Sequence, residues 1–346
     1  MPEETQEAQD TRICLTCSKT FPSDQKRCPF DGVDLVDIAV NEPIPPLDET
    51  YDFISARRSR IALIFHLKHK TSGQEVIAKV LSATGNKERE KKRFMRMVEL
   101  MSAMTHPGVP RVIESASLPD GTPYILLEYR SGVSLGELLK QRGRISILDL
   151  CEITCQVCDV LEHAHELGIV HPDLSPGDII VEESSPHNWN VSVVDFGKGN
   201  PLLHSDNRKV QLTEEGDFFG TPEFMAPEIL QTKNVDERSN IYSLGCIMYF
   251  CLKGRVPIKG PNWFSTLHQH QTMAVSPIYD EPKSKTETEI EEIVFKALEK
   301  DPKNRYANMA ELKSALLWLS GSLDADLSET KSASLKPRAA AKKKKS

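Results

Sequence analysis

The chain has 346 residues, of which 39% are hydrophobic and 27% are charged, and its formal net charge is −7. This composition is typical of a folded protein and excludes collagen-like and wholly disordered chains. The longest mostly apolar run, Ile241 to Leu252, falls short of the ~20 residues that a helix needs to cross a bilayer. We therefore expect a cytoplasmic protein without a transmembrane segment, and the acidic start Met1-Pro2-Glu3-Glu4 is not typical of a secretory signal.

Basic residues concentrate at the C-terminal end of the chain. Residues 331–346 contain seven lysines and arginines and no acid, so the rest of the chain is markedly acidic. An acidic body argues against nucleic-acid binding over the globular surface. The run Lys342 to Lys345 predicts at most a weak, salt-sensitive contact with an anionic surface, because each lysine adds only ~1 kcal/mol there. A purely solubilising tail is the alternative.

Composition and hydrophobic pattern divide the chain into five segments. They are residues 1–11 (disordered), 12–38 (zinc-ribbon-like), 39–50 (a proline-rich acidic linker), 51–319 (continuously patterned) and 320–346 (a disordered basic tail). In the long segment the predicted elements are strands 61–67 and 75–81, helix 87–104, strands 111–117 and 123–129, and helices 150–164, 236–252, 287–299 and 307–319. This order predicts an α+β fold of two lobes, a β-rich N-lobe (51–130) and an α-rich C-lobe (131–319).

Three cysteines near the N-terminus have the spacing of metal ligands. Cys14 and Cys17 form a CxxC pair, and Cys28 opens the run Cys28-Pro29-Phe30-Asp31-Gly32. Two such turns place four ligands around a tetrahedral zinc ion, and carboxylate oxygen also binds zinc, so Asp31 is the predicted fourth ligand of a structural site. The alternative is that these are ordinary thiols. The remaining cysteines lie on predicted helices and are expected to be small buried side chains: Cys151, Cys155, Cys158, Cys246 and Cys251.

A series of short motifs runs through residues 51–319. In chain order they are Val76-Ile77-Ala78-Lys79, Val170-His171-Pro172-Asp173, Val193-Val194-Asp195-Phe196-Gly197, Gly220-Thr221-Pro222-Glu223-Phe224-Met225-Ala226-Pro227-Glu228, Arg238-Ser239-Asn240-Ile241-Tyr242-Ser243-Leu244-Gly245 and Asp301-Pro302-Lys303-Asn304-Arg305-Tyr306. Together, their order and spacing resemble the eukaryotic-like Ser/Thr protein kinases, particularly the bacterial branch. The cysteine segment also resembles ribbons that some bacterial kinase-like proteins carry. The resemblance implies a bilobal protein-kinase fold preceded by a small zinc-ribbon-like knuckle.

The resemblance implies a role for each retained motif in ATP-dependent phosphoryl transfer to a protein hydroxyl. Lys79 would bind the α- and β-phosphates, and Asp173 would orient the substrate hydroxyl. Asp195 would hold Mg²⁺, with Asp178 as a further metal ligand. The hinge would be Glu128-Tyr129-Arg130, whose backbone would pair with adenine. ATP with Mg²⁺ and a protein substrate or docking partner are therefore the implied partners.

Several positions depart from the family pattern where phosphate is bound. The three glycine positions of the phosphate loop hold Arg57, Ser59 and Ala62. The helix glutamate expected to pair with Lys79 is replaced by Met97. Glu99 lies about 200° further round the helix, so we expect it to face away. Lys79 then lacks its usual orienting anion.

The catalytic loop departs as well. Pro172 stands where the family has arginine, so a phosphorylated activation segment has no arginine there to bind, and Ser175 replaces the catalytic-loop lysine. Asp178 replaces the family asparagine. Asn240 replaces the aspartate that braces this loop, and we expect its amide to make only part of those hydrogen bonds.

The architectural motifs are retained, and the resemblance implies a buried ion pair of Glu228 and Arg305. The motifs that specify the fold are therefore retained, while several residues that the family uses in catalysis are replaced. This leaves more than one function open. The chain is either a weak or impaired Ser/Thr protein kinase, or a pseudokinase that senses nucleotide or docks a partner without catalysis. A further alternative is that the cysteine knuckle is the docking surface and the lobes are scaffold.

Overall fold

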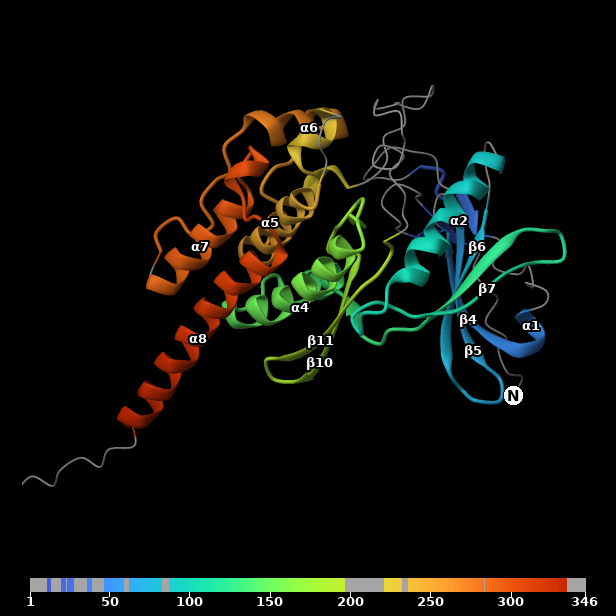
Figure 1. Cartoon of the computed structure of the whole chain (residues 1–346), viewed down its shortest axis with the longest axis horizontal. Coiled ribbons are helices and arrows are strands. Elements are labelled where there is room, and N and C mark those ends of the chain that lie inside the picture. The colour runs from blue at the N-terminus through green and yellow to red at the C-terminus, as the bar shows by residue number, and fades with distance from the viewer. Residues whose placement is uncertain are drawn as a thin grey trace, which may run out of the picture.

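The computed structural model describes residues 11–13, 20–22, 24–27, 36–38, 47–58, 62–82, 87–196, 221–231, 236–282 and 284–334. These residues form one lobe built on a five-stranded sheet and a second lobe that is mainly helical (Figure 1). The α+β bilobal architecture expected from the sequence is therefore confirmed.

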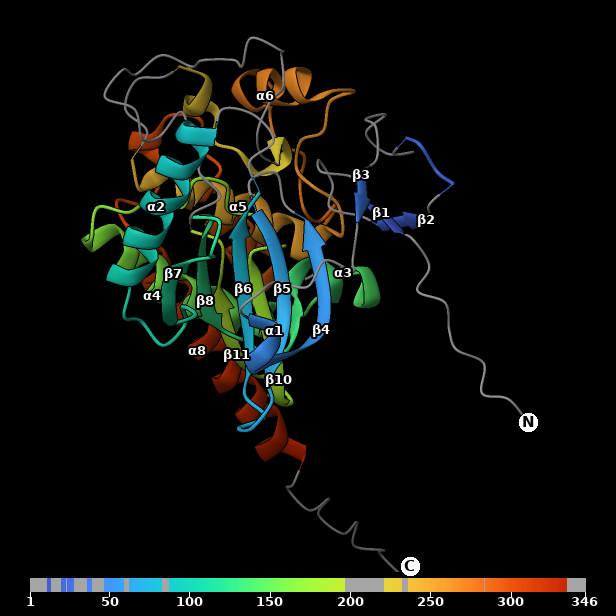
Figure 2. The ribbon, with the colours of Figure 1, turned by 90° about the vertical axis from the view of Figure 1, so that its right-hand side faces the viewer.

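The N-lobe is an antiparallel sheet in the order β4-β5-β6-β8-β7, with helix α2 packed against it (Figure 2). Its elements are α1 (Leu47–Thr50), β4 (Tyr51–Arg58), β5 (Ala62–His69), β6 (Glu75–Leu81), α2 (Lys87–Ala103), β7 (Val112–Ser117) and β8 (Pro123–Glu128). Four buried residues recur at helical spacing and give α2 the apolar face that packs on the sheet. They are Phe94, Met97, Val98 and Met101.

Alternation along β6 decides which side chains reach the face that α2 covers. Because residues i and i+2 of a strand share a face, Lys79 points to the same side as Ile77 and Leu81, which pack with α2. The intervening residues of β6 pack in a separate cluster on the opposite face. Cross-strand pairing places Ile64 and Ile125 beside Lys79. The sheet therefore presents one lysine within an apolar surface.

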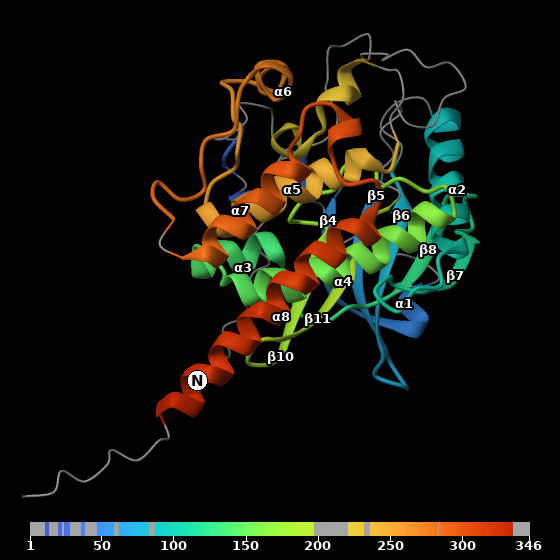
Figure 3. The ribbon, with the colours of Figure 1, turned by 60° about the vertical axis from the view of Figure 1, so that its left-hand side comes forward.

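The C-lobe is built around α4 and α5, whose side chains fill most of its core. Its elements are β9 (Val133–Ser134), α3 (Leu135–Arg142), α4 (Ile147–Glu166), β10 (Ile179–Ser185), β11 (Asn188–Val193), 3-10 turns at Pro222–Phe224 and Pro227–Gln231, α5 (Arg238–Lys253), α6 (Trp263–Thr272), α7 (Lys285–Ala297), a 3-10 turn at Pro302–Asn304 and α8 (Met309–Ser334). Helix α8 lies along α4 (Figure 3), where Lys313 forms an ion pair with Asp159 at 2.6 Å. The predicted burial of the five C-lobe cysteines is confirmed.

Most of the predicted strands and helices are present within a few residues of their expected bounds, but several elements were not predicted. Strand β4 was missed because a bulge between Phe53 and Ser55 breaks its alternation. Strand β10 was missed because its second half is polar, and α3 and α6 because they are short. The expectation of a structureless tail from residue 320 is wrong up to Ser334, because helix α8 continues there.

A small antiparallel sheet in the order β2-β1-β3 precedes the lobes (Figure 2). Its strands are β1 (Thr11–Ile13), β2 (Thr20–Pro22) and β3 (Val36–Ile38). Ile13, at the end of the central strand β1, pairs with Thr20 of β2 and with Val36 of β3. The predicted zinc ligands lie outside the described residues, and the zinc site stays a prediction: Cys14, Cys17, Cys28 and Asp31.

Candidate active site

Lys79 of β6 and Asp195, which follows β11, form a buried ion pair between the two lobes. Lys79 is 6% exposed and Asp195 is 4% exposed. The backbone of Asp195 has φ 65°, a left-handed conformation that aspartate tolerates better than most residues. The fold therefore brings together two predicted site residues that are 116 positions apart in the sequence.

His171 connects the strand that leads to Asp195 with the loop that carries Asp173. Its Nε2 lies 3.2 Å from the carbonyl oxygen of Val194, and its Nδ1 accepts the backbone N–H of Asp173 at 3.4 Å. The imidazole also packs edge-on against the buried ring of Phe196, with centroids 4.8 Å apart. One ring therefore fixes both segments relative to each other.

The carboxylate of Asp173 is half-buried, and its Oδ1 accepts the backbone N–H of Thr221 at 2.9 Å. Thr221 belongs to the predicted Gly-Thr-Pro motif. The candidate residue for orienting a hydroxyl is thus held from its own loop and from this second motif.

Asp178 is fully buried and is tied to the residue that replaces the family lysine. Its Oδ2 accepts the backbone N–H of Ser175 at 3.0 Å and the hydroxyl of Ser175 at 2.7 Å. Its carbonyl oxygen accepts the N–H of Val194 at 2.8 Å, which keeps Asp178 next to the segment of Asp195. Ser175 therefore serves the acid rather than a phosphate.

The two acids Asp178 and Asp195 fit the Mg²⁺ that the resemblance implies. Magnesium prefers carboxylate oxygens and is usually held by one or two of them together with substrate phosphates and water. Within the described ranges, no group of three or more His, Cys, Asp or Glu converges on one point. A metal here would therefore depend on ligands from the nucleotide.

Helix α2 supplies no anion to Lys79 from the expected position. Met97 is buried in the apolar face of α2. The side chain of Glu99 is 70% exposed and lies 3.9 Å from Arg96, so the expectation that it faces away is confirmed. Asp195 takes the place of the helix glutamate as the anion beside Lys79.

Two of the three substituted glycine positions are strand residues. Arg57 pairs with Ile64 in the β4–β5 ladder, and Ala62 is the buried first residue of β5. Ser59 lies outside the described residues. A Cβ is ordinary in a strand, so the substitutions at 57 and 62 are compatible with the hairpin.

The side chains of the hinge engage the protein rather than the cleft. Tyr129 stacks on His66 of β5, with centroids 4.2 Å apart. Arg130 donates from Nη2 to the carbonyl oxygen of Val109 at 2.8 Å and pairs with Glu128 at 3.1 Å. The backbone N–H of Glu128 is also engaged within the protein, because it donates to the carbonyl oxygen of Arg111 at 2.9 Å.

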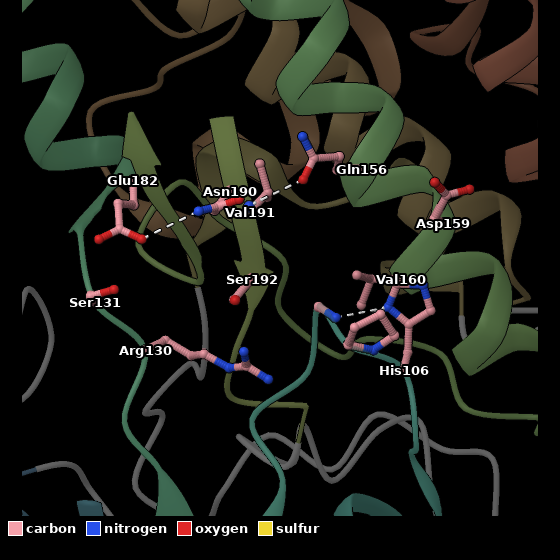
Figure 4. A pocket seen from close by; sticks show the side chains of 12 residues that line it. His106, Arg130, Ser131, Gln156, Asp159, Val160, Glu182, Asn190, Val191 and Ser192 are labelled. Carbon is pink, nitrogen blue, oxygen red and sulfur yellow. Dashed lines mark hydrogen bonds between the residues drawn. The ribbon is translucent and has the colours of Figure 1, made fainter. Parts of the chain in front are cut away.

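The guanidinium of Arg130 lies on the wall of a cavity of about 450 Å³ (Figure 4). Other walls come from the loop before β7 and from α4, β10 and β11. The lining residues are His106, Pro107, Gly108, Arg130, Ser131, Gln156, Asp159, Val160, Glu182, Asn190, Val191 and Ser192. Gln156 accepts the N–H of Val191 at 3.2 Å and donates to the carbonyl oxygen of Trp189 at 2.7 Å, which satisfies the outer edge of β11. Burial, followed by the neighbouring His163, lowers the pKa of His106.

The C-lobe ion pair is confirmed. Arg305 donates from both terminal nitrogens to Glu228, at 2.7 and 2.8 Å. Ser239 adds a hydrogen bond to the same carboxylate at 2.7 Å. This bidentate pair joins the 3-10 turn Pro227–Gln231, which contains Glu228, to the segment after the turn Pro302–Asn304.

The amide of Asn240 is fully engaged, although its bonds are those of an amide and not of the carboxylate in the family pattern. Its amide bonds both the N–H and the carbonyl of His171, and His165 bonds it as well. Sequence reasoning missed His165 because a single histidine on a helix gives no signal that its partner is 75 residues away.

Comparison with known proteins defines the class. The protein kinase domain family matches residues 60–317, and the chain belongs to this family. No helix among the described residues has the length and apolar character needed to span a membrane.

The similar proteins are bacterial Ser/Thr kinases. Serine/threonine-protein kinase PknB of Mycolicibacterium smegmatis is 32% identical over 229 residues, covering 65% of this chain and 35% of that protein. A probable serine/threonine-protein kinase PknB of Bifidobacterium longum is 30% identical over 258 residues, covering 71% of this chain and 36% of that protein. The match therefore spans about a third of the length of these relatives. The crystal structure of Rad53 1-466 in complex with AMP-PNP has TM-score 0.61 at 22% identity over 77% of this chain and 65% of that chain, which supports the fold alone.

Proposed function

We propose that this chain is an ATP-dependent Ser/Thr protein kinase with a reduced rate of phosphoryl transfer. The observation that carries the proposal is the buried pair of Lys79 and Asp195 between the lobes, beside a loop that holds Asp173. Phosphoryl transfer needs positioned phosphates, a held metal and an oriented hydroxyl. Lys79, Asp195 with Asp178, and Asp173 would supply these three parts.

The chemistry divides among the chain's own residues. The carbonyl oxygen of Glu128 and the backbone of Arg130 would bind adenine, and Lys79 would bind the phosphates. Bound Mg²⁺ would neutralise phosphate charge, held by Asp195 and Asp178. Asp173 would accept the hydroxyl proton, held in position by the N–H of Thr221.

The reduced rate follows from the missing contacts. Loss of one preorganised contact to developing charge commonly costs ~10²–10³ in rate. The chain lacks the glycine loop, a helix glutamate at Met97 and a lysine at Ser175, and such losses are not additive. Kinases typically turn over at ~1–100 s⁻¹, so we expect slow but detectable transfer.

A transfer assay with γ-labelled ATP and a generic protein substrate tests the proposal. We expect a signal in the wild type that Asp173→Ala abolishes. A thermal-shift titration with ATP, with and without Mg²⁺, is the second measurement, and Lys79→Ala should remove the shift. Absence of transfer together with an ATP shift that depends on Lys79 would replace the proposal by its alternative.

That alternative is a pseudokinase that senses nucleotide or docks a partner. Two observations favour it: Lys79 is already neutralised by Asp195, and Ser175 is engaged with Asp178. Absence of any ATP-dependent shift at millimolar ATP would narrow the alternative to a scaffold.

The flanking segments carry separate proposals. We propose a structural zinc ion on Cys14, Cys17, Cys28 and Asp31, supported by their spacing and by strands β1, β2 and β3, which flank these positions in the sequence. Zinc measured by mass spectrometry should fall when Cys28→Ser is introduced. Deleting residues 1–40 tests whether partner docking depends on this knuckle.

A cytoplasmic location is a further expectation, and cell fractionation tests it. Weak contact of the basic tail with anionic vesicles is another, and vesicle sedimentation at two salt concentrations tests it.

A further inference from the structure

Asn240 lies on helix α5, is 2% exposed and contacts the loop that carries Asp173. Its Oδ1 lies 2.8 Å from the backbone nitrogen of His171 and 3.0 Å from Nε2 of His165, and its Nδ2 lies 2.7 Å from the carbonyl oxygen of His171. These are ordinary hydrogen-bond distances. One amide therefore meets both backbone polar groups of the residue two before Asp173.

The chemistry of the partners fixes the direction of each bond. A backbone N–H can only donate, so the atom opposite the nitrogen of His171 is the amide oxygen of Asn240. A carbonyl oxygen can only accept, so the atom opposite the oxygen of His171 is the amide nitrogen. His165 must then donate from Nε2 to the oxygen of Asn240. Burial lowers the pKa of His165, which keeps it in the neutral form with that proton on Nε2.

Pro172 explains why an amide suits this position. Proline has no backbone N–H, so the pair His171-Pro172 offers one donor, from residue 171. A carboxylate at 240 could accept that single N–H, but its second oxygen would face the carbonyl oxygen of His171. An amide instead offers one acceptor and one donor, which matches the carbonyl and the lone N–H.

We propose that Asn240 and His165 are positioning residues matched to Pro172, so that two departures from the family pattern compensate each other. Asn240 fixes the backbone of His171 from below, and the imidazole of His171 in turn contacts the N–H of Asp173 and the carbonyl of Val194. Through His171, the hydrogen bonds of Asn240 thereby set the position of Asp173 relative to Asp195. Its role in transfer rests on the proposed function, whereas its match to Pro172 does not.

A double-mutant cycle tests the match. The variants are Asn240→Asp, Pro172→Ala and the two combined; alanine restores the N–H at 172 with the smallest side chain. With Pro172 in place, we expect Asn240→Asp to lower the Tm by roughly 4–8 °C, because a buried acceptor is left facing an acceptor. In the Pro172→Ala background the same change should cost less than half as much. The carbonyl of residue 171 and the N–H of residue 172 point in opposite directions in a trans peptide, so rotation of this peptide turns the carbonyl away and presents the new N–H to the second oxygen. Equal costs in both backgrounds would overturn the proposal.

The effects of proline on chain entropy and packing occur in both arms of the cycle and cancel. Asn308→Asp is the matched control. Asn308 is exposed and its Oδ1 accepts the N–H of Glu311 at 2.9 Å, a helix cap that aspartate makes equally well. We expect its Tm to stay within about 1 °C of the wild type.

His165 is tested by a pair of variants. Glutamine retains a donor for the oxygen of Asn240, whereas leucine retains only bulk. We expect His165→Leu to lower the Tm more than His165→Gln does, and equal losses would exclude a hydrogen-bonding role.

A kinetic readout separates positioning from stability. Well below the Tm, we expect Asn240→Asp to lower kcat for protein phosphorylation about tenfold or more with KM for ATP unchanged, and Pro172→Ala to restore part of that loss. Parallel losses in kcat and KM, or no kinetic change, would contradict positioning. If the wild type transfers no phosphate, the proposed function fails, but the Tm cycle still decides whether Asn240 is matched to Pro172.

Discussion

The phenol of Tyr242 lies 2.8 Å from Nδ1 of His270, and both side chains are fully buried between α5 and α6. Lys300 donates to the phenol oxygen at 3.4 Å. Burial, followed by the nearby charge of Lys300, lowers the pKa of His270 to about 4. The folded C-lobe therefore excludes a proton that the unfolded chain binds near neutral pH.

Stability should consequently fall in mild acid. The folded pKa of His270 lies below the unfolded value, so its contribution is present above pH ~6.5 and is lost as the pH falls towards 4. The loss is on the order of 3 kcal/mol. Urea denaturation at a series of pH values gives the free energy of unfolding as a function of pH. Its slope against pH should be shallower for His270→Gln than for the wild type. His268→Gln, an exposed histidine of the same helix, should leave the slope unchanged.

Removing the anion of the C-lobe ion pair should be strongly destabilising. In Glu228→Gln the guanidinium of Arg305, whose side chain is 0% exposed, stays buried without its carboxylate. We expect a loss of about 3–5 kcal/mol in the free energy of unfolding. Glu99→Gln is the control, because Glu99 is exposed and lies 3.9 Å from Arg96; a similar loss in both variants would show that burial of the pair is not the cause.

Restoring a carboxylate on α2 should improve the site. Met97 belongs to the face of α2 that packs on the Lys79 side of the sheet. In Met97→Glu the new anion can share Lys79 with Asp195, and we expect phosphoryl transfer to rise about tenfold while the Tm falls, because a charge is buried. Met97→Gln should show no increase in rate. An unchanged rate in Met97→Glu would indicate that Asp195 already orients Lys79 sufficiently.

Asp178→Asn should alter the dependence of nucleotide binding on metal. The amide oxygen of asparagine can still accept the N–H and hydroxyl of Ser175, but one negative charge beside the Asp195 segment is removed. We expect ATP without Mg²⁺ to bind several-fold more tightly and the gain from adding Mg²⁺ to shrink. Thermal-shift titrations measure both effects. Asp173→Asn, in the same loop, should leave the metal dependence as it is.

The sequence predicted well those parts of the fold that depend on local pattern. Periodicity located α4 and α5, and motif order located Lys79, Asp195 and the pair of Glu228 with Arg305. Pattern failed at β4, where a bulge breaks the alternation of apolar residues. It also failed for β10, because polar residues there are held in the ladder by β11 rather than by their own propensity.

The candidate site was predictable by residue type but not by contact. The family resemblance implied that Lys79 lacks a helix anion, and only the fold shows that Asp195 lies beside it. The hydrogen-bonding capacity of the Asn240 amide does not by itself predict its contacts. The donors and acceptors of its partners decide which hydrogen bonds form. Pro172 removes one donor, and His165 adds another from a different helix.

The pairing of Lys79 with Asp195 bears on how an incoming triphosphate is received. Because the ammonium group already has an internal counter-ion, a bound nucleotide would replace one anion by another instead of meeting an unpaired charge. Asp195 would then be released to a metal ion as Lys79 binds phosphate, so that the two events would be halves of a single exchange. Magnesium and nucleotide should therefore enter cooperatively, each weakening the internal bond that opposes the other.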